Sequence, residues 1–117
     1  MAEGINVETK SADNLFAGNF PVVEVPVVVA SGAGVLTRGT VLGKITANGK
    51  YKAYNNGASD GSEVAKLILA KNVDATSADV NTVAYRTGEF NESALTGLDA
   101  AAKVDFETTP IIIKKVY

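Results

Sequence analysis

The sequence predicts a compact, mainly β domain with a short helical part, an α+β fold that carries an extended N-terminal arm. Three observations predict this class: β-branched apolar runs separated by turn residues, an Asn-Gly pair between two such runs, and one helical apolar stripe late in the chain. A chain of 117 residues fits one domain. We therefore expect a flexible arm over residues 1–20 and a single globular domain over residues 21–117.

Asn48-Gly49 is the strongest local signal. It separates an apolar run over residues 40–46 from a second run over residues 50–54. Asn-Gly between two such runs is typical of a hairpin with a two-residue type I′ turn, because both turn residues need positive φ. Gly43 inside the first run predicts a β-bulge or a close approach by another backbone. A third strand is expected over residues 64–70.

Further apolar runs extend the sheet on both sides of this core. Residues 21–30 predict either an edge strand or a strand interrupted at Pro26, because proline cannot donate to a ladder. Residues 79–87 predict another strand, followed by a turn or bulge at Gly88. The last run, residues 111–113, is expected to be buried on both faces, by the core or by another subunit.

One segment has helical character, residues 96–106. Thr96 followed by Asp99 predicts a capping box at its start. The apolar stripe that follows consists of Leu98, Ala101, Ala102 and Phe106. Gly97 weakens a continuous helix, so residues 91–95 are expected to form a short turn of their own.

The first twenty residues differ from the rest. Their apolar members follow no helical or strand period: Ile5, Val7, Leu15, Phe16 and Phe20. One interpretation is a frayed terminus. The other is an arm that becomes ordered on a partner, since these side chains are unusually apolar for a solvated tail. Composition alone leaves both open.

Composition narrows the possible chemistry. The chain has no histidine and no cysteine, which excludes Ser-His-Asp catalysis and thiolate metal sites. Its net charge of −2 argues against nucleic-acid binding. No apolar run approaches the roughly 20 residues that span a bilayer, and the start lacks the pattern of a signal peptide. We expect no enzyme, no catalytic residue, no cofactor and no metal.

Order and spacing together give the chain a family resemblance. The residues that carry it are 36–46, Lys50, Tyr51, Tyr54 and 58–65, followed in the same order by 68–69, 73–75, 88–91 and 94–95. With these residues the chain resembles the lambda-type head decoration proteins of tailed bacteriophages. The resemblance covers roughly residues 20–117.

The resemblance implies a structural virion protein, made in the host cytoplasm and placed on the outer surface of the expanded phage head. It implies a homotrimer at three-fold and quasi-three-fold positions that bridges major capsid protein subunits and stabilises the shell against internal DNA pressure. It also implies an N-terminal arm that becomes ordered on the capsid. On that basis Ile5, Val7, Leu15, Phe16 and Phe20 are the expected capsid-binding residues. For the trimer interface, residues 27–29 and 111–113 are the apolar runs to inspect first.

Two alternatives stay open at this point. One is a barrel-sandwich carrier domain of the biotinyl or lipoyl kind, since residues 39–45 are similar to its strands. Such domains present a modified lysine at a hairpin tip between small or Met residues, and residues 48–51 lack that pattern. The other is a β domain that binds glycans or another surface, for which Tyr51 and Tyr54 are the only neighbouring aromatic pair.

Overall fold

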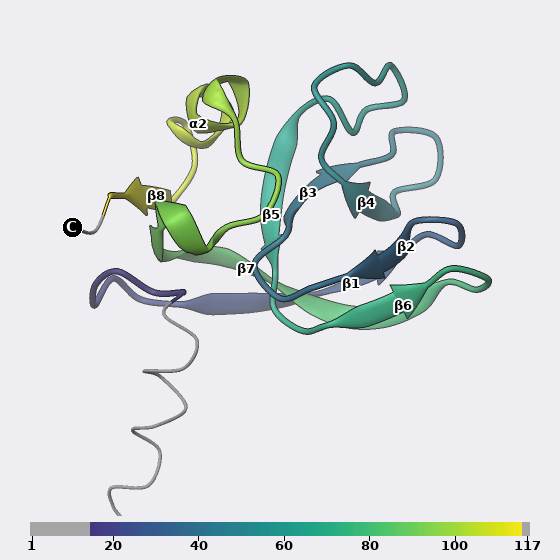
Figure 1. Cartoon of the computed structure of the whole chain (residues 1–117), viewed down its shortest axis with the longest axis horizontal. Helices are drawn as coiled ribbons and strands as arrows, with labels where there is room; N and C mark the ends of the chain where they lie inside the picture. Colours follow the sequence, from purple (N-terminus) through teal and green to yellow (C-terminus); the bar gives the residue numbers. More distant parts are fainter. Residues whose placement is uncertain (1–14, 116–117) are drawn as a thin grey trace, which may run out of the picture.

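Five strands close into a small barrel in the middle of the molecule (Figure 1). The structure is a computed structural model that describes residues 15–115. The barrel strands are β1 (Val23–Val29), β3 (Val41–Lys44), β4 (Tyr51–Ala53), β5 (Ala65–Leu69) and β7 (Val80–Asn91). They pair in the order β1-β4-β3-β5-β7, and β7 pairs again with β1. The predicted mainly β class is confirmed.

The smaller elements lie at the two ends of the barrel (Figure 1). At one end β2 (Gly34–Leu36) and β6 (Val73–Ala75) form an antiparallel ribbon. At the other end lie the 3-10 turn η1 (Glu92–Ala94), the helix α2 (Ala100–Phe106) and the strand β8 (Ile111–Lys114). β8 runs parallel to the end of β7.

Pro26 lies within β1 without breaking it. β1 pairs antiparallel with β7 along its whole length, with Pro26 opposite Val83, and it meets β4 where Val29 lies opposite Tyr51. A proline is tolerated on the side of a strand that donates no ladder hydrogen bond. The interruption at Pro26 is therefore wrong. The edge-strand alternative is met only in part, because β1 has β7 along one side and meets β4 on the other side only at Val29.

The predicted hairpin joins β3 to β4, but its turn is longer than expected. The Ile45 N–H donates to the Lys50 carbonyl at 2.7 Å and the Gly49 N–H donates to the Ile45 carbonyl at 2.8 Å, so residues 46–49 form the loop. Gly49 has a φ of 76°, and the Asn48 side chain accepts the Lys50 N–H at 2.9 Å. The two-residue type I′ turn is wrong because a side-chain hydrogen bond closes a wider loop.

Gly43 marks both of the features predicted for it. The pairing of β3 with β5 shifts register between Leu42 and Gly43. A Cβ on Gly43 would lie 2.5 Å from the Ser62 carbonyl oxygen and 2.6 Å from the Ser62 Cα. The third strand of this region is confirmed as β5, which pairs antiparallel with β3.

β7 continues past the position where a turn was expected. Gly88 lies inside the strand, with a φ of 149° that favours glycine. β7 pairs with β1 up to Thr87 and with β8 from Gly88 onward. A register irregularity does exist, but it falls at Arg86, which has no partner between the Val23–Thr87 and Glu24–Tyr85 pairs. The turn or bulge at Gly88 is therefore wrong.

The helix α2 begins later than predicted because Asp99 is its N-cap. The Asp99 Oδ1 accepts the Ala102 N–H at 2.8 Å. Thr96 takes no part in this cap, since its backbone bonds to Gly39 and Val41 instead. The capping box is therefore wrong. The separate short turn before the helix is confirmed as η1.

β3, β5 and β7 each bury their two faces in different clusters. Val41, Ile68 and Tyr85 join the cluster that also holds Ala102 and Phe106 of α2. Their neighbours on the same strands join the second cluster, which contains Leu42, Leu69, Ala84, Val27 and Val29. Period-2 alternation along β3, β5 and β7 thus separates the two halves of the core.

β8 is buried unevenly in the single chain. Ile111 is buried, whereas Ile112 and Ile113 are half-buried. The expectation of burial on both faces is therefore met only at Ile111 within this chain.

Candidate functional site

Residues 15–17 run along the end of β7 and pair with it through one isolated β-bridge; we call them the N-terminal clip. The Asn91 N–H donates to the Leu15 carbonyl at 2.7 Å, and the Ala17 N–H donates to the Glu89 carbonyl at 2.9 Å. Phe16 lies antiparallel opposite Phe90. β8 pairs with the same stretch of β7. The clip and β8 therefore flank the end of β7 on its two sides.

Leu15, one of the expected capsid-binding residues, belongs to the hydrophobic core. Its side chain is 2% exposed and packs in the same cluster as Phe90 and Phe106. Its Cδ1 lies 3.4 Å from where a Cβ on Gly39 would stand. Leu15 thus fastens the clip and offers no surface in this conformation. Ile5 and Val7 lie outside the described residues.

Phe16 packs its ring on two aromatic residues of β7. The ring centroids lie 5.1 Å from Tyr85, edge to face, and 5.3 Å from Phe90. The Phe16 side chain remains 36% exposed, which leaves one part of its ring available to a partner.

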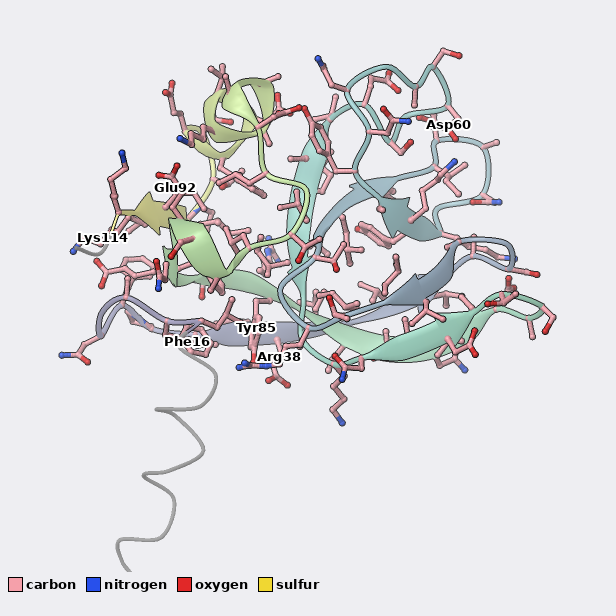
Figure 2. The ribbon with its side chains drawn as sticks, in the orientation of Figure 1. Phe16, Arg38, Asp60, Tyr85, Glu92 and Lys114 are labelled. Atoms are coloured by element: carbon pink, nitrogen blue, oxygen red, sulfur yellow. The ribbon has the colours of Figure 1, made fainter. Side chains whose placement is uncertain are left out.

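Arg38 completes this aromatic cluster (Figure 2). Its guanidinium carbon lies 5.6 Å from the ring centroids of both Phe16 and Tyr85, within the range of cation–π attraction. Its Nη2 donates to the Tyr85 hydroxyl at 2.8 Å. Sequence reasoning assigned Arg38 no role, because nothing near it in the chain indicates that Phe16 lies beside it.

Phe20 begins an exposed apolar segment that leads into β1. Phe20 is 36% exposed, and Val22 and Val23 are 45% and 47% exposed. The Thr87 hydroxyl holds this segment in place, since it accepts the Val23 N–H at 2.9 Å and donates to the Pro21 carbonyl at 2.7 Å. The structure brings Phe16 and Phe20 to the surface near one end of β7, and it places Leu15 beneath them.

Ion pairs on the described surface are exposed and contribute little to stability. They join Lys50 to Asp79 at 2.7 Å, Lys52 to Asp60 at 3.1 Å, Lys103 to Glu92 at 2.7 Å and Lys114 to Glu89 at 3.6 Å.

Neighbouring groups shift the pKa values of Asp60 and Tyr54. Hydrogen bonds from the Ser62 hydroxyl and N–H, with the Lys52 ammonium, hold the pKa of Asp60 well below its usual value. Burial raises the pKa of Tyr54 to about 12, together with the Asp99 carboxylate, which accepts its hydroxyl at 2.8 Å. Asp60 closes a tight turn and Tyr54 joins β4 to α2, so both act on the scaffold.

The two alternative functions lose their structural basis at the hairpin. Lys50 lies at the base of the 46–49 loop, where its carbonyl accepts the Ile45 N–H, and its ammonium pairs with Asp79, so it is not a lysine presented at the tip. Tyr54 is 7% exposed, which leaves Tyr51 without an exposed aromatic neighbour for stacking on a sugar.

Residues 15–115 offer little that is typical of a reactive centre. Their Asp and Glu side chains form no group of three able to hold a metal ion. No helix in this part of the chain is long and apolar enough to cross a membrane. A cleft of about 400 Å³ lies between η1 and α2, but the Lys103–Glu92 ion pair lies in its wall.

A family model described as bacteriophage lambda head decoration protein D matches residues 8–109, nearly the whole chain. No curated protein matches the chain at a significant level. The matched range takes in the clip, the barrel and α2, and it begins before the first described residue.

Proposed function

The chain belongs to the bacteriophage lambda head decoration protein D family, and we propose on this basis that it acts as a homotrimer that stabilises the capsid against internal DNA pressure. Its family makes it a structural protein of the phage head, located on the outer surface of the capsid in the virion. The family is one of capsid decoration, not of enzymes. The family match is the observation that carries the proposal.

The proposed partner is the major capsid protein, contacted at three-fold and quasi-three-fold positions. We propose that residues 1–20 form the capsid-binding arm and that residues 21–117 form the domain. Extended arms bind by adding a strand to an exposed sheet edge, where main-chain hydrogen bonds give affinity and alternate side chains give specificity. Ile5 and Val7 have this spacing. Because Leu15 is buried, the contacts proposed for the described residues fall to Phe16 and Phe20.

The proposed trimer draws support from apolar surface that the single chain leaves uncovered. Exposed valines occur at positions 22, 23, 35, 64 and 104. Val27 and Val29 are buried inside the barrel, so they are no longer interface candidates, whereas Ile112 and Ile113 are half-buried and remain so. Three arms on one trimer raise apparent affinity by about 10²–10⁴ through avidity.

Two measurements test the proposal. Light scattering on the purified chain should give the mass of a trimer at tens of micromolar, and a monomer there would contradict it. A variant that lacks residues 1–14 should keep the fold and the trimer but fail to bind expanded heads of the phage that carries it. Its control is the full chain, bound to the same heads in the same experiment. Full binding by the truncated variant would remove the arm from the mechanism.

A further inference from the structure

We propose that the N-terminal clip fixes the point and the direction in which the arm leaves the domain, and that Arg38 is the positioning residue that holds the clip closed. This inference rests on the proposed capsid-binding arm. The free part of the arm would then end at residue 15 and not at the start of β1. Residue 15 lies on the opposite side of β7 from β8.

The backbone of the clip has a defined register. Two hydrogen bonds, from Asn91 to Leu15 and from Ala17 to Glu89, surround the Phe16–Phe90 pair. This is the non-hydrogen-bonded type of antiparallel pair, in which the two side chains approach most closely. A shift by one residue would turn Phe16 away from Phe90 and expose Leu15, so the register is strongly specified.

Two glycines lie beside the clip. A Cβ on Gly88 would lie 3.6 Å from the Phe16 ring, an ordinary contact distance, and 3.0 Å from the Phe90 ring. A Cβ on Gly39 would lie 3.4 Å from the Leu15 side chain and 3.0 Å from the Ala94 carbonyl oxygen. The clip therefore packs closely against β7 and against the segment that leads into β3.

Arg38 links the clip to the loop between β5 and β6. Its guanidinium contacts the Phe16 and Tyr85 rings, while its backbone N–H donates to the Asn72 side chain at 2.7 Å. Asn72 lies between β5 and β6. The backbone of Arg38 is therefore held by the loop between β5 and β6, and its guanidinium is held by the Tyr85 hydroxyl of β7.

Fixing the point where the arm leaves the domain favours binding, because less conformational entropy is lost when the arm binds the capsid. Each side chain or segment immobilised in advance lowers the cost of association. A loosened clip would let the arm swing from residue 21 and would lower its effective concentration at the capsid. We expect Arg38→Ala to weaken binding to expanded heads roughly tenfold, from the loss of this preorganisation.

Arg86→Ala is the matched control. Arg86 is an exposed arginine on β7, so its removal changes the net charge by the same amount. Among residues 15–115, the hydrogen bonds and ring contacts of the clip involve Phe90, Tyr85, Asn91, Glu89 and Arg38, whereas Arg86 points to solvent. Arg86→Ala should bind heads as tightly as the unmodified chain, and a loss equal to that of Arg38→Ala would show that charge alone matters, which would overturn the inference.

Amide hydrogen exchange reports on the clip without any capsid. The Ala17 and Asn91 amides should exchange faster in Arg38→Ala than in Arg86→Ala, while the amides of β3 and β5 stay unchanged. If Arg38→Ala fails to fold, Arg38→Met, which keeps the packing of the stem, is measured in its place. Unchanged exchange at Ala17 and Asn91 would overturn the inference.

The variant without residues 1–14 separates this inference from the proposed function. If that variant binds heads fully, the arm proposal fails and the inference falls with it. If it loses binding while Arg38→Ala exchanges faster at the clip yet binds heads normally, the arm proposal stands and the positioning role alone is overturned.

Discussion

At the scale of single residues, the missing Cβ of Gly43 and the hydroxyl oxygen of Tyr54 each determine a local contact. Gly43 lets the Ser62 backbone approach to a distance that no Cβ tolerates. Tyr54 buries its ring under α2 and satisfies its hydroxyl on Asp99. Each supports a separate prediction.

Gly43→Ala should destabilise the fold by about 1–3 kcal/mol, the usual cost of forcing extra atoms into a packed site. The neighbouring atoms belong to the Ser62 backbone, which cannot rotate away. Gly57→Ala is the control, because its Cβ would meet only the Asn55 side chain at an ordinary 3.5 Å. Chemical denaturation of both variants checks this, and equal midpoints would contradict it.

Tyr54→Phe should cost about 1 kcal/mol at neutral pH, the net value of one hydrogen bond. The fold raises the pKa of Tyr54 from 10.0 to about 12, so it disfavours the ionised phenol. The stabilisation is therefore complete below pH 10 and is lost as the pH rises from 10 toward 12. The stability gap between the two proteins should shrink over that range.

Thermal unfolding of both proteins from pH 7 to 11 measures this gap. At pH 7, Tyr51→Phe is the control, since Tyr51 is half-buried at the start of β4 and loss of its hydroxyl should change stability by less than about 0.5 kcal/mol. A gap that stays constant above pH 10 would count against the assigned pKa.

At the scale of elements, α2 depends on one cap. Asp99→Ala should destabilise by about 2–4 kcal/mol, because it removes the acceptor of the Ala102 N–H and also the acceptor of the buried Tyr54 hydroxyl. Thr96→Ala, the control, should change little, since Thr96 is exposed and bonds through its backbone. Urea denaturation distinguishes the two variants, and a larger effect at Thr96 would restore the capping box.

Elements whose signals are local could be predicted from the sequence. Asn48-Gly49 lies between two runs that do form a hairpin, and Gly97 does separate η1 from α2. The predictions of the helix cap and of the hairpin turn were wrong because another side chain made the hydrogen bond. Asp99 is the N-cap, while the Thr96 backbone bonds to Val41 of β3. In the hairpin, the Asn48 side chain accepts the Lys50 N–H within a four-residue loop.

At the scale of the whole molecule, the pairings that close the barrel could not be predicted. β1 and β7 are far apart in the sequence, and no local pattern indicates which strands will meet. The clip could not be predicted for the same reason. Leu15 and Phe16 have no period of their own, and their partners Tyr85 and Phe90 lie at the other end of the chain.

Hydrogen exchange over the whole chain should reflect the barrel. Amides of β5 should be among the slowest to exchange, because β5 has strand neighbours on both sides and a buried face toward each cluster. Amides of the two-stranded β2–β6 ribbon, where Val35 is 69% exposed, should exchange faster. Equal protection of the ribbon and of β5 would contradict this order.

The position of β7 between the clip and β8 has a mechanical consequence. A tension applied at residue 15 enters the molecule through the clip and meets β7 at residues 89–91, which the clip contacts through two backbone hydrogen bonds. The same residues of β7 are tied to Ile112–Lys114 on their other side. The load is therefore shared between β7 and β8 before it reaches the part of β7 that belongs to the barrel.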